Sequence, residues 1–191
     1  MEESHRIKYA GQDDLDAFNC LALIHQDLIF NYAFRMLGEQ EAAECVTQKT
    51  FQQAYLEFNL FQPGCFHHFL LRIASHLCCK ELDERENHLL SMEPVDQLLS
   101  PAGNGGQEEL GLLIRQSLKK LPPEFRSVAI LVDFLGFNYC QAAEILEIPP
   151  GSVKDHLAKA RMLIYEQSIT WQKSRAESMT KVIGRKPGVK T

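Results

Sequence analysis

The sequence lacks an excess of basic residues, since its 191 residues carry 20 Lys and Arg against 25 Asp and Glu. A uniformly basic surface therefore cannot be the basis of nucleic-acid binding, which would have to come from a local motif. The chain also lacks the run of about 20 apolar residues that crosses a bilayer. Its first residues, MEESHRIKYAGQDDLD, are polar and unlike a signal peptide. We therefore expect a cytoplasmic protein.

Sequence motifs of the common enzyme classes are also missing. The chain has no G-x-S-x-G nucleophile elbow, no P-loop and no G-x-G-x-x-G after a strand, and its periodicity predicts no strand at all. We therefore expect neither an enzyme nor a bound cofactor. The cysteines form no C-x-x-C pair, and we interpret them as reduced and mostly buried thiols. They are Cys20, Cys45, Cys65, Cys78, Cys79 and Cys140.

Charge and composition divide the chain into segments. Residues 14–90 carry a net charge of −6, whereas residues 109–170 are neutral overall. Between them, the stretch 91–108 is rich in Pro and Gly and has no persistent apolar face, which is typical of a flexible linker. We therefore predict an N-terminal domain at 1–90, a linker at 91–108, a C-terminal domain at 109–170 and a basic tail at 171–191.

Apolar residues recur every three or four positions in the N-terminal half, which predicts helices. The first should span Asp14–Leu37 and end at Gly38, and the second should span about Gln40–Phe58. A third should begin near Phe66, after the break FQPG. Three helices of this length can enclose one small core.

The C-terminal half is helical by the same criterion. A stripe from Leu110 to Leu121 is followed by a break at Pro122 and Pro123, and a further stripe ends at Gly136. Together with the N-terminal half, this pattern predicts an all-α chain of two small helical domains joined by a flexible linker.

The last two predicted helices form a helix-turn-helix. Asn138 with Gln141, and Ser152 with Asp155, have capping-box spacing and predict two helix starts. The segment EIPPGS between these helices is expected to be a non-helical turn. A second helix that begins in polar and basic residues suits the major groove of DNA. The candidate DNA contacts are Ser152, Lys154, His156, Lys159 and Arg161.

Two parts of the chain resemble a known family. The run LPPEFRSVAILVDFLGFNYCQAAEILEIPPGSVKDHLAKARMLI is similar to the promoter −35-binding domain of bacterial sigma factors, in order and without gaps. The runs AFRMLGEQEAAECVTQKTFQQAY and FQPGCFHHFLLRIASHL are similar to the polymerase-binding and −10-binding domain of the extracytoplasmic-function group. Together the two resemblances cover about residues 14–170.

The resemblance implies a function. A protein of this group binds core RNA polymerase at the clamp of its largest subunit, directs it to promoter DNA and is held by an anti-sigma factor, here expected to be membrane-associated, until a signal releases it. The resemblance places polymerase contacts at Glu44, Gln48 and Phe51, and contacts near the −35 element on the last helix. Candidate contacts near the −10 element are Lys49, Arg72 and Lys80.

The third helix leaves an alternative open. It ends in KELDERENH, and carboxylates there would repel DNA phosphates. The chain could therefore be a sigma-like decoy or adaptor that binds an anti-sigma factor or polymerase without reading promoters.

Scattered His and Cys residues leave a metal-dependent protein as a second alternative. Zinc sites usually show paired C-x-x-C or H-x-x-x-H spacing, which is missing here, and neighbouring Cys78 and Cys79 point about 100° apart on a helix. We therefore predict no metal site. The residues concerned are Cys65, His67, His68, His76, Cys78, Cys79 and His88.

Overall fold

The computed structural model describes residues 14–57, 65–89 and 106–183. Every regular element in these ranges is helical, which confirms the all-α prediction. Most of the predicted linker, and the last eight residues of the predicted basic tail, lie outside the described residues.

Three helices form the N-terminal domain: α2 (Asp14–Leu37), α3 (Gln40–Leu56) and α4 (Phe66–Leu89). Their bounds match the predicted ones because the helix breakers act locally. Gly38 ends α2 with a φ of +72°, a conformation that residues with a Cβ rarely adopt. Apolar side chains of the predicted inner faces are buried between the helices, including Leu21, Tyr32 and Ile73.

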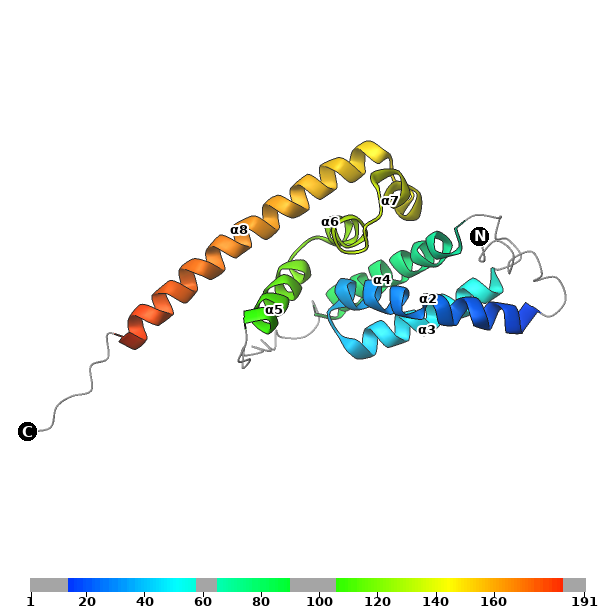
Figure 1. Cartoon of the computed structure of the whole chain (residues 1–191), viewed down its shortest axis with the longest axis horizontal. Helices are drawn as coiled ribbons and strands as arrows, with labels where there is room; N and C mark the ends of the chain where they lie inside the picture. The colour runs from blue at the N-terminus through cyan, green and yellow to red at the C-terminus, as the bar shows by residue number, and fades with distance from the viewer. Residues whose placement is uncertain (1–13, 58–64, 90–105, 184–191) are drawn as a thin grey trace, which may run out of the picture.

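The C-terminal domain consists of α5 (Gly106–Lys119), α6 (Pro123–Ala129), a single π-helical turn η2 (Ile130–Phe134), α7 (Tyr139–Leu146) and α8 (Pro150–Ile183). Helix α5 begins inside the segment predicted as linker, and α8 continues far into the predicted tail. In Figure 1, α8 extends well beyond the remaining helices toward the C-terminus.

The prediction of a non-helical turn over EIPPGS is wrong for its last three residues, which belong to α8. Pro150 and Gly151 belong to the first turn of α8, and the Val153 amide donates to the Pro149 carbonyl. Proline is tolerated at the first helical position because that residue's N–H would have no partner inside the helix anyway. Ser152 therefore lies within the helix, and the predicted Ser152–Asp155 capping box is not the start of α8.

The predicted capping box of α7 is confirmed. The Asn138 carboxamide oxygen accepts from the Gln141 amide at 3.0 Å, and the Gln141 side chain accepts from the Asn138 amide at 3.0 Å. We expect Asn138→Ala to lower the free energy of unfolding by about 1 kcal/mol in urea titrations. Ser152→Ala is the matched control and should change it by less than about 0.5 kcal/mol, since Ser152 starts no helix. Equal losses in both variants would contradict this assignment.

The two domains pack against each other over one continuous apolar core. Helix α4 contacts α7, and α2 contacts α5 and α6. Arg126 lies at the centre of this contact, 5% exposed, and donates to the carbonyl oxygens of Met36, Lys119 and Leu121. These carbonyls belong to the C-terminal ends of α2 and α5 and to the residues that follow α5. One guanidinium thus joins the domains.

The prediction that the cysteines are mostly buried is wrong. Cys20, Cys45, Cys65 and Cys140 are exposed, and Cys79 is half-buried. Cys78 is the fully buried one, and burial raises the pKa of its thiol well above the ordinary value. Among the described helices, none has both the length and the apolar character needed to cross a membrane.

Candidate functional sites

The helix-turn-helix is built by α7, a three-residue turn and the start of α8. Glu147 ends α7 in the left-handed region, with a φ of 54°, and its amide donates to the last carbonyls of α7. Val153, Leu157 and Ala160 form the buried stripe that fixes α8 against the rest of the domain. The opposite side of the first turns of α8 faces solvent.

Two of the predicted DNA contacts are exposed on that side. Lys154 and Lys159 face solvent, and the Lys159 ammonium lies 5.5 Å from the centre of the Phe125 ring. Asp155 is exposed beside Lys154. The exposed start of α8 therefore presents two cations and one carboxylate to a ligand.

The other three predicted DNA contacts, Arg161, His156 and Ser152, are paired, packed or half-buried within the domain. Arg161 makes a two-pronged ion pair with Asp133 of η2, with N–O distances of 3.1 and 2.5 Å, and this hydrogen bonding raises the pKa of the guanidinium. The His156 ring packs edge-on against Phe125 at 5.2 Å, and its Nδ1 is buried without a partner. Ser152 is half-buried. Sequence spacing gave no signal for the Asp133 contact, because Asp133 and Arg161 meet only in the folded domain.

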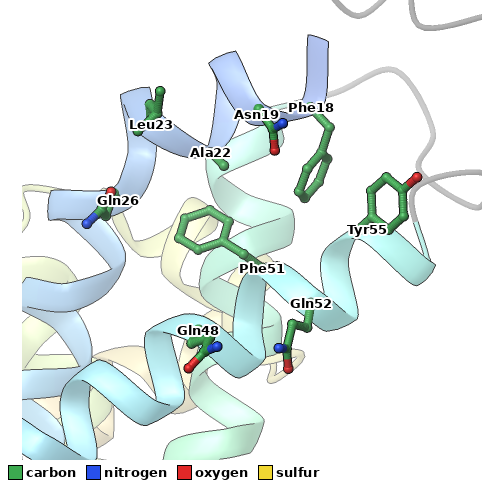
Figure 2. A pocket seen from close by; sticks show the side chains of 9 residues that line it. All are labelled: Phe18, Asn19, Ala22, Leu23, Gln26, Gln48, Phe51, Gln52 and Tyr55. Carbon is green, nitrogen blue, oxygen red and sulfur yellow. The ribbon is translucent and has the colours of Figure 1, made fainter. Parts of the chain in front are cut away.

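A groove of about 700 Å³ runs between α2 and α3. Figure 2 shows Phe51 reaching from α3 toward Ala22 of α2, with Phe18 and Tyr55 at one end of the groove. The Phe18 and Tyr55 rings meet edge-on at 5.2 Å. Polar side chains also line it, namely Asn19, Gln26, Gln48 and Gln52.

The predicted polymerase contacts lie on or beside this groove. Gln48 and Phe51 line it, whereas Glu44 is exposed one turn before Gln48 on α3 and accepts from the Gln40 side chain at 2.9 Å. The sequence missed the α2 side of the groove. Its signal is Leu23, which lines the groove and is 72% exposed, together with the neighbouring Ile24, which is 57% exposed.

Two of the three candidate −10 contacts, Arg72 and Lys80, lie beside carboxylates. The Arg72 guanidinium lies 3.5 Å from the carboxylate of Glu147, which follows α7, so it forms an ion pair with the C-terminal domain. The Lys80 ammonium lies 3.9 Å from Glu84. Lys49 lines a small pocket that also contains Lys80 and Glu84.

The acidic end of α4 remains exposed. Arg85 neutralises part of it through ion pairs with Glu39 at 3.0 Å and Glu81 at 3.1 Å. Asp83, Glu84 and Glu86 face solvent on the same helix. The repulsion of phosphate expected from the sequence therefore persists in the fold.

The structure brings together three of the His and Cys residues considered for metal binding. Cys65, His67 and His68 each offer one ligand atom, and these three atoms lie within 4.8 Å of one another. His76 lies elsewhere on α4, where its Nε2 is 3.5 Å from Glu147. The prediction of no metal site did not anticipate this cluster, because it was based on spacing of paired motifs.

Comparisons with known proteins bear on both domains. The family model "Sigma-70, region 4" matches residues 111–164, which include α6, η2, α7 and the start of α8. The "ECF RNA polymerase sigma factor SigW" of Bacillus subtilis is 29% identical over 176 residues, covering 85% of this chain and 94% of SigW. The corresponding SigE of Mycolicibacterium smegmatis is 28% identical over 160 residues, 81% of this chain, and the match spans 62% of SigE.

Solved structures share the fold. CnrH, in complex with the cytosolic domain of CnrY, has a TM-score of 0.66 at 20% identity, covering 88% of this chain and 97% of CnrH. The sigma factor RpoE of Bartonella quintana, in complex with the anti-sigma factor NepR, has a TM-score of 0.64 at 20% identity and covers 80% and 97% of the two chains.

Proposed function

We propose that this chain, which belongs to the extracytoplasmic-function group of RNA polymerase sigma factors, binds core RNA polymerase in the cytoplasm and directs it to specific promoters. The observation that carries this proposal is the combination, in one chain, of the region 4 helix-turn-helix with an N-terminal domain that exposes a groove for a protein partner. No reaction is assigned to the chain itself, which acts by binding.

The α2–α3 groove is the proposed contact with the clamp of the largest polymerase subunit. Its apolar floor around Phe51 and its carboxamide rim at Gln48 and Gln52 suit a helical partner with mixed apolar and polar side chains. Glu44 extends this surface with a negative charge that would attract basic residues of the partner.

Weakened polymerase binding is the expected result of Gln48→Ala. Loss of one rim contact should cost about 1 kcal/mol, or about fivefold in Kd, measured by titrating labelled chain with core enzyme. The matched control is Gln53→Ala, because Gln53 is exposed on the same helix about 140° around from Gln48 and does not line the groove. A failure of the unchanged chain to co-elute with core enzyme at moderate salt would contradict the proposed function.

Promoter binding requires the two domains to separate from the arrangement seen here. Arg72, a candidate −10 contact, is paired with Glu147 of the helix-turn-helix domain, and Arg126 holds α2 to α5 and α6. We infer that polymerase separates the domains when it takes up the α2–α3 groove. The start of α8 would then read the −35 element while α4 approaches the −10 region.

An anti-sigma factor is the proposed inhibitory partner. Large apolar side chains are exposed in the middle of α2, at the C-terminal end of α3, where Leu56 is 79% exposed, and on α8 at Met162 and Tyr165. Apolar surface of this kind suits a protein partner. We propose that this partner is membrane-associated, so that a signal outside the cell can release the sigma factor.

The exposed acidic end of α4 favours a second candidate function, a decoy that binds polymerase or an anti-sigma factor without reading promoters. In vitro transcription with purified core enzyme separates the two. Genomic fragments bound by the holoenzyme should yield discrete transcripts if the chain is a sigma factor, whereas a decoy would bind core enzyme and start none.

A further inference from the structure

We propose that Cys65, His67 and His68 form a binding site for a divalent transition metal, best suited to Zn²⁺, with Glu144 as the carboxylate that orients His68. Cys65 immediately precedes α4, and the two histidines lie in its first turn. The three candidate ligand atoms lie within 4.8 Å of one another, close enough for a single ion to join them after small rotations of the side chains.

His68 provides an independent reason for this site. It is 8% exposed, and its Nε2 is buried with no hydrogen-bond partner. Its other nitrogen, Nδ1, lies 3.4 Å from the Glu144 carboxylate. A carboxylate on one imidazole nitrogen and a ligand position on the other is the arrangement that metal-binding histidines typically have. A buried nitrogen without a partner is costly, and coordination would remove that cost.

The donor set determines which metal fits. One thiolate and two imidazoles suit Zn²⁺ and related late transition metals rather than Mg²⁺ or Ca²⁺, which prefer oxygen ligands. Cys65 is exposed, so the ion has a route from solvent and a fourth position open to water. Binding would displace the thiol proton of Cys65 into solvent, because the thiolate is the form that coordinates.

The site lies where the two domains meet. Cys65, His67 and His68 belong to the N-terminal domain, whereas Glu144 lies on α7 of the helix-turn-helix domain. Phe137, just before α7, packs against the His67 and His68 rings at 5.8 and 5.6 Å. A ligand that binds one arrangement better than another stabilises that arrangement. The metal should therefore bind most tightly when the domains are packed as seen here. Its binding should raise the Tm of the chain.

The test is a titration of reduced, metal-free full-length chain with Zn²⁺ in a calorimeter, together with Co²⁺ absorption spectra that detect a thiolate ligand. We expect one ion per chain and a sulfur-to-cobalt charge-transfer band. Cys65→Ser should abolish the band and weaken Zn²⁺ binding at least tenfold. Glu144→Gln should keep the band and weaken binding about 10- to 100-fold. The matched control is Cys45→Ser, an exposed cysteine on α3 outside the cluster, which should leave both readouts unchanged.

Several outcomes would overturn the proposal. These are no Zn²⁺ binding up to millimolar concentration, unchanged affinity and band in Cys65→Ser, or loss of both in Cys45→Ser. Because Cys65 is exposed and precedes α4, its replacement should leave the helical circular dichroism signal intact. The test therefore does not require replacing His68, which is buried and whose loss could unfold the chain. None of these readouts involves polymerase or DNA, so they test the site separately from the proposed function.

Discussion

Replacing Arg126 with methionine is expected to lower the free energy of unfolding by about 3 kcal/mol. The Arg126 side chain is the donor to three carbonyl oxygens: its contacts with Met36 and Leu121 are buried, and its contact with Lys119 is partly buried. Each buried carbonyl left without a donor costs about 1–3 kcal/mol. Burial lowers the pKa of Arg126, so removing the charge recovers part of that loss. Methionine keeps most of the side-chain volume, and urea denaturation measures the difference.

The matched control is Arg115→Met on α5. Arg115 is exposed and lies with its guanidinium carbon 4.5 Å from the centre of the Phe34 ring, a contact that contributes about 0.5–1 kcal/mol. The same chemical change should therefore have a much smaller effect. If the two variants lost equal stability, the carbonyl contacts of Arg126 would not be the cause, and the account of how the domains are joined would be wrong.

Local signals in the sequence were sufficient for the helices. The bounds of α2 follow from one apolar stripe and from Gly38, whose positive φ ends the helix. The start of α7 follows from Asn138 and Gln141, whose reciprocal hydrogen bonds need only residues three apart. Such features could be predicted because each involves residues in one short segment.

The errors at α8 and the cysteines have different physical causes. Ser152 was predicted to cap the helix because Pro150 was assumed to prevent helix formation. Pro150 instead occupies the first helical position, in the first turn of α8, where the N–H groups have no partner inside the helix. The exposure of Cys20 and Cys45 depends on which face of each helix packs, and a thiol tolerates both environments. Residue type alone could not settle either point.

The contacts between the domains could not be predicted at all. Arg126 with Met36, Arg72 with Glu147 and His68 with Glu144 join residues about 75–90 positions apart. Charge patterns along a helix report pairs three or four positions apart and carry no information on such distant partners. The cluster of Cys65, His67 and His68 is local and was missed because only paired motifs were considered, whereas the contact of His68 with Glu144 joins distant residues.

Substituting alanine for Lys154 and Lys159 together is expected to reduce −35-dependent transcription about 30-fold. Of the predicted DNA contacts on α8, these two are exposed cations without an ion-pair partner among the described residues, whereas Arg161 is paired with Asp133. Each lost phosphate contact should lower the slope of log affinity against log salt by about one, so the double variant should lose about two. Filter binding at several salt concentrations, beside in vitro transcription, measures both quantities.

The control for this variant uses the same helix. Lys173→Ala removes an exposed lysine on α8 about 20 Å beyond Lys159, so it should leave −35 binding unchanged if only the start of the helix enters the groove. The unchanged chain, the double variant and Lys173→Ala should bind polymerase with equal affinity, because none of these changes lies in the α2–α3 groove. A salt slope that falls as much in Lys173→Ala as in the double variant would show that α8 contacts DNA along its length. Unchanged promoter use in the double variant would instead exclude these lysines, and with them the exposed start of α8, as the reader of the −35 element.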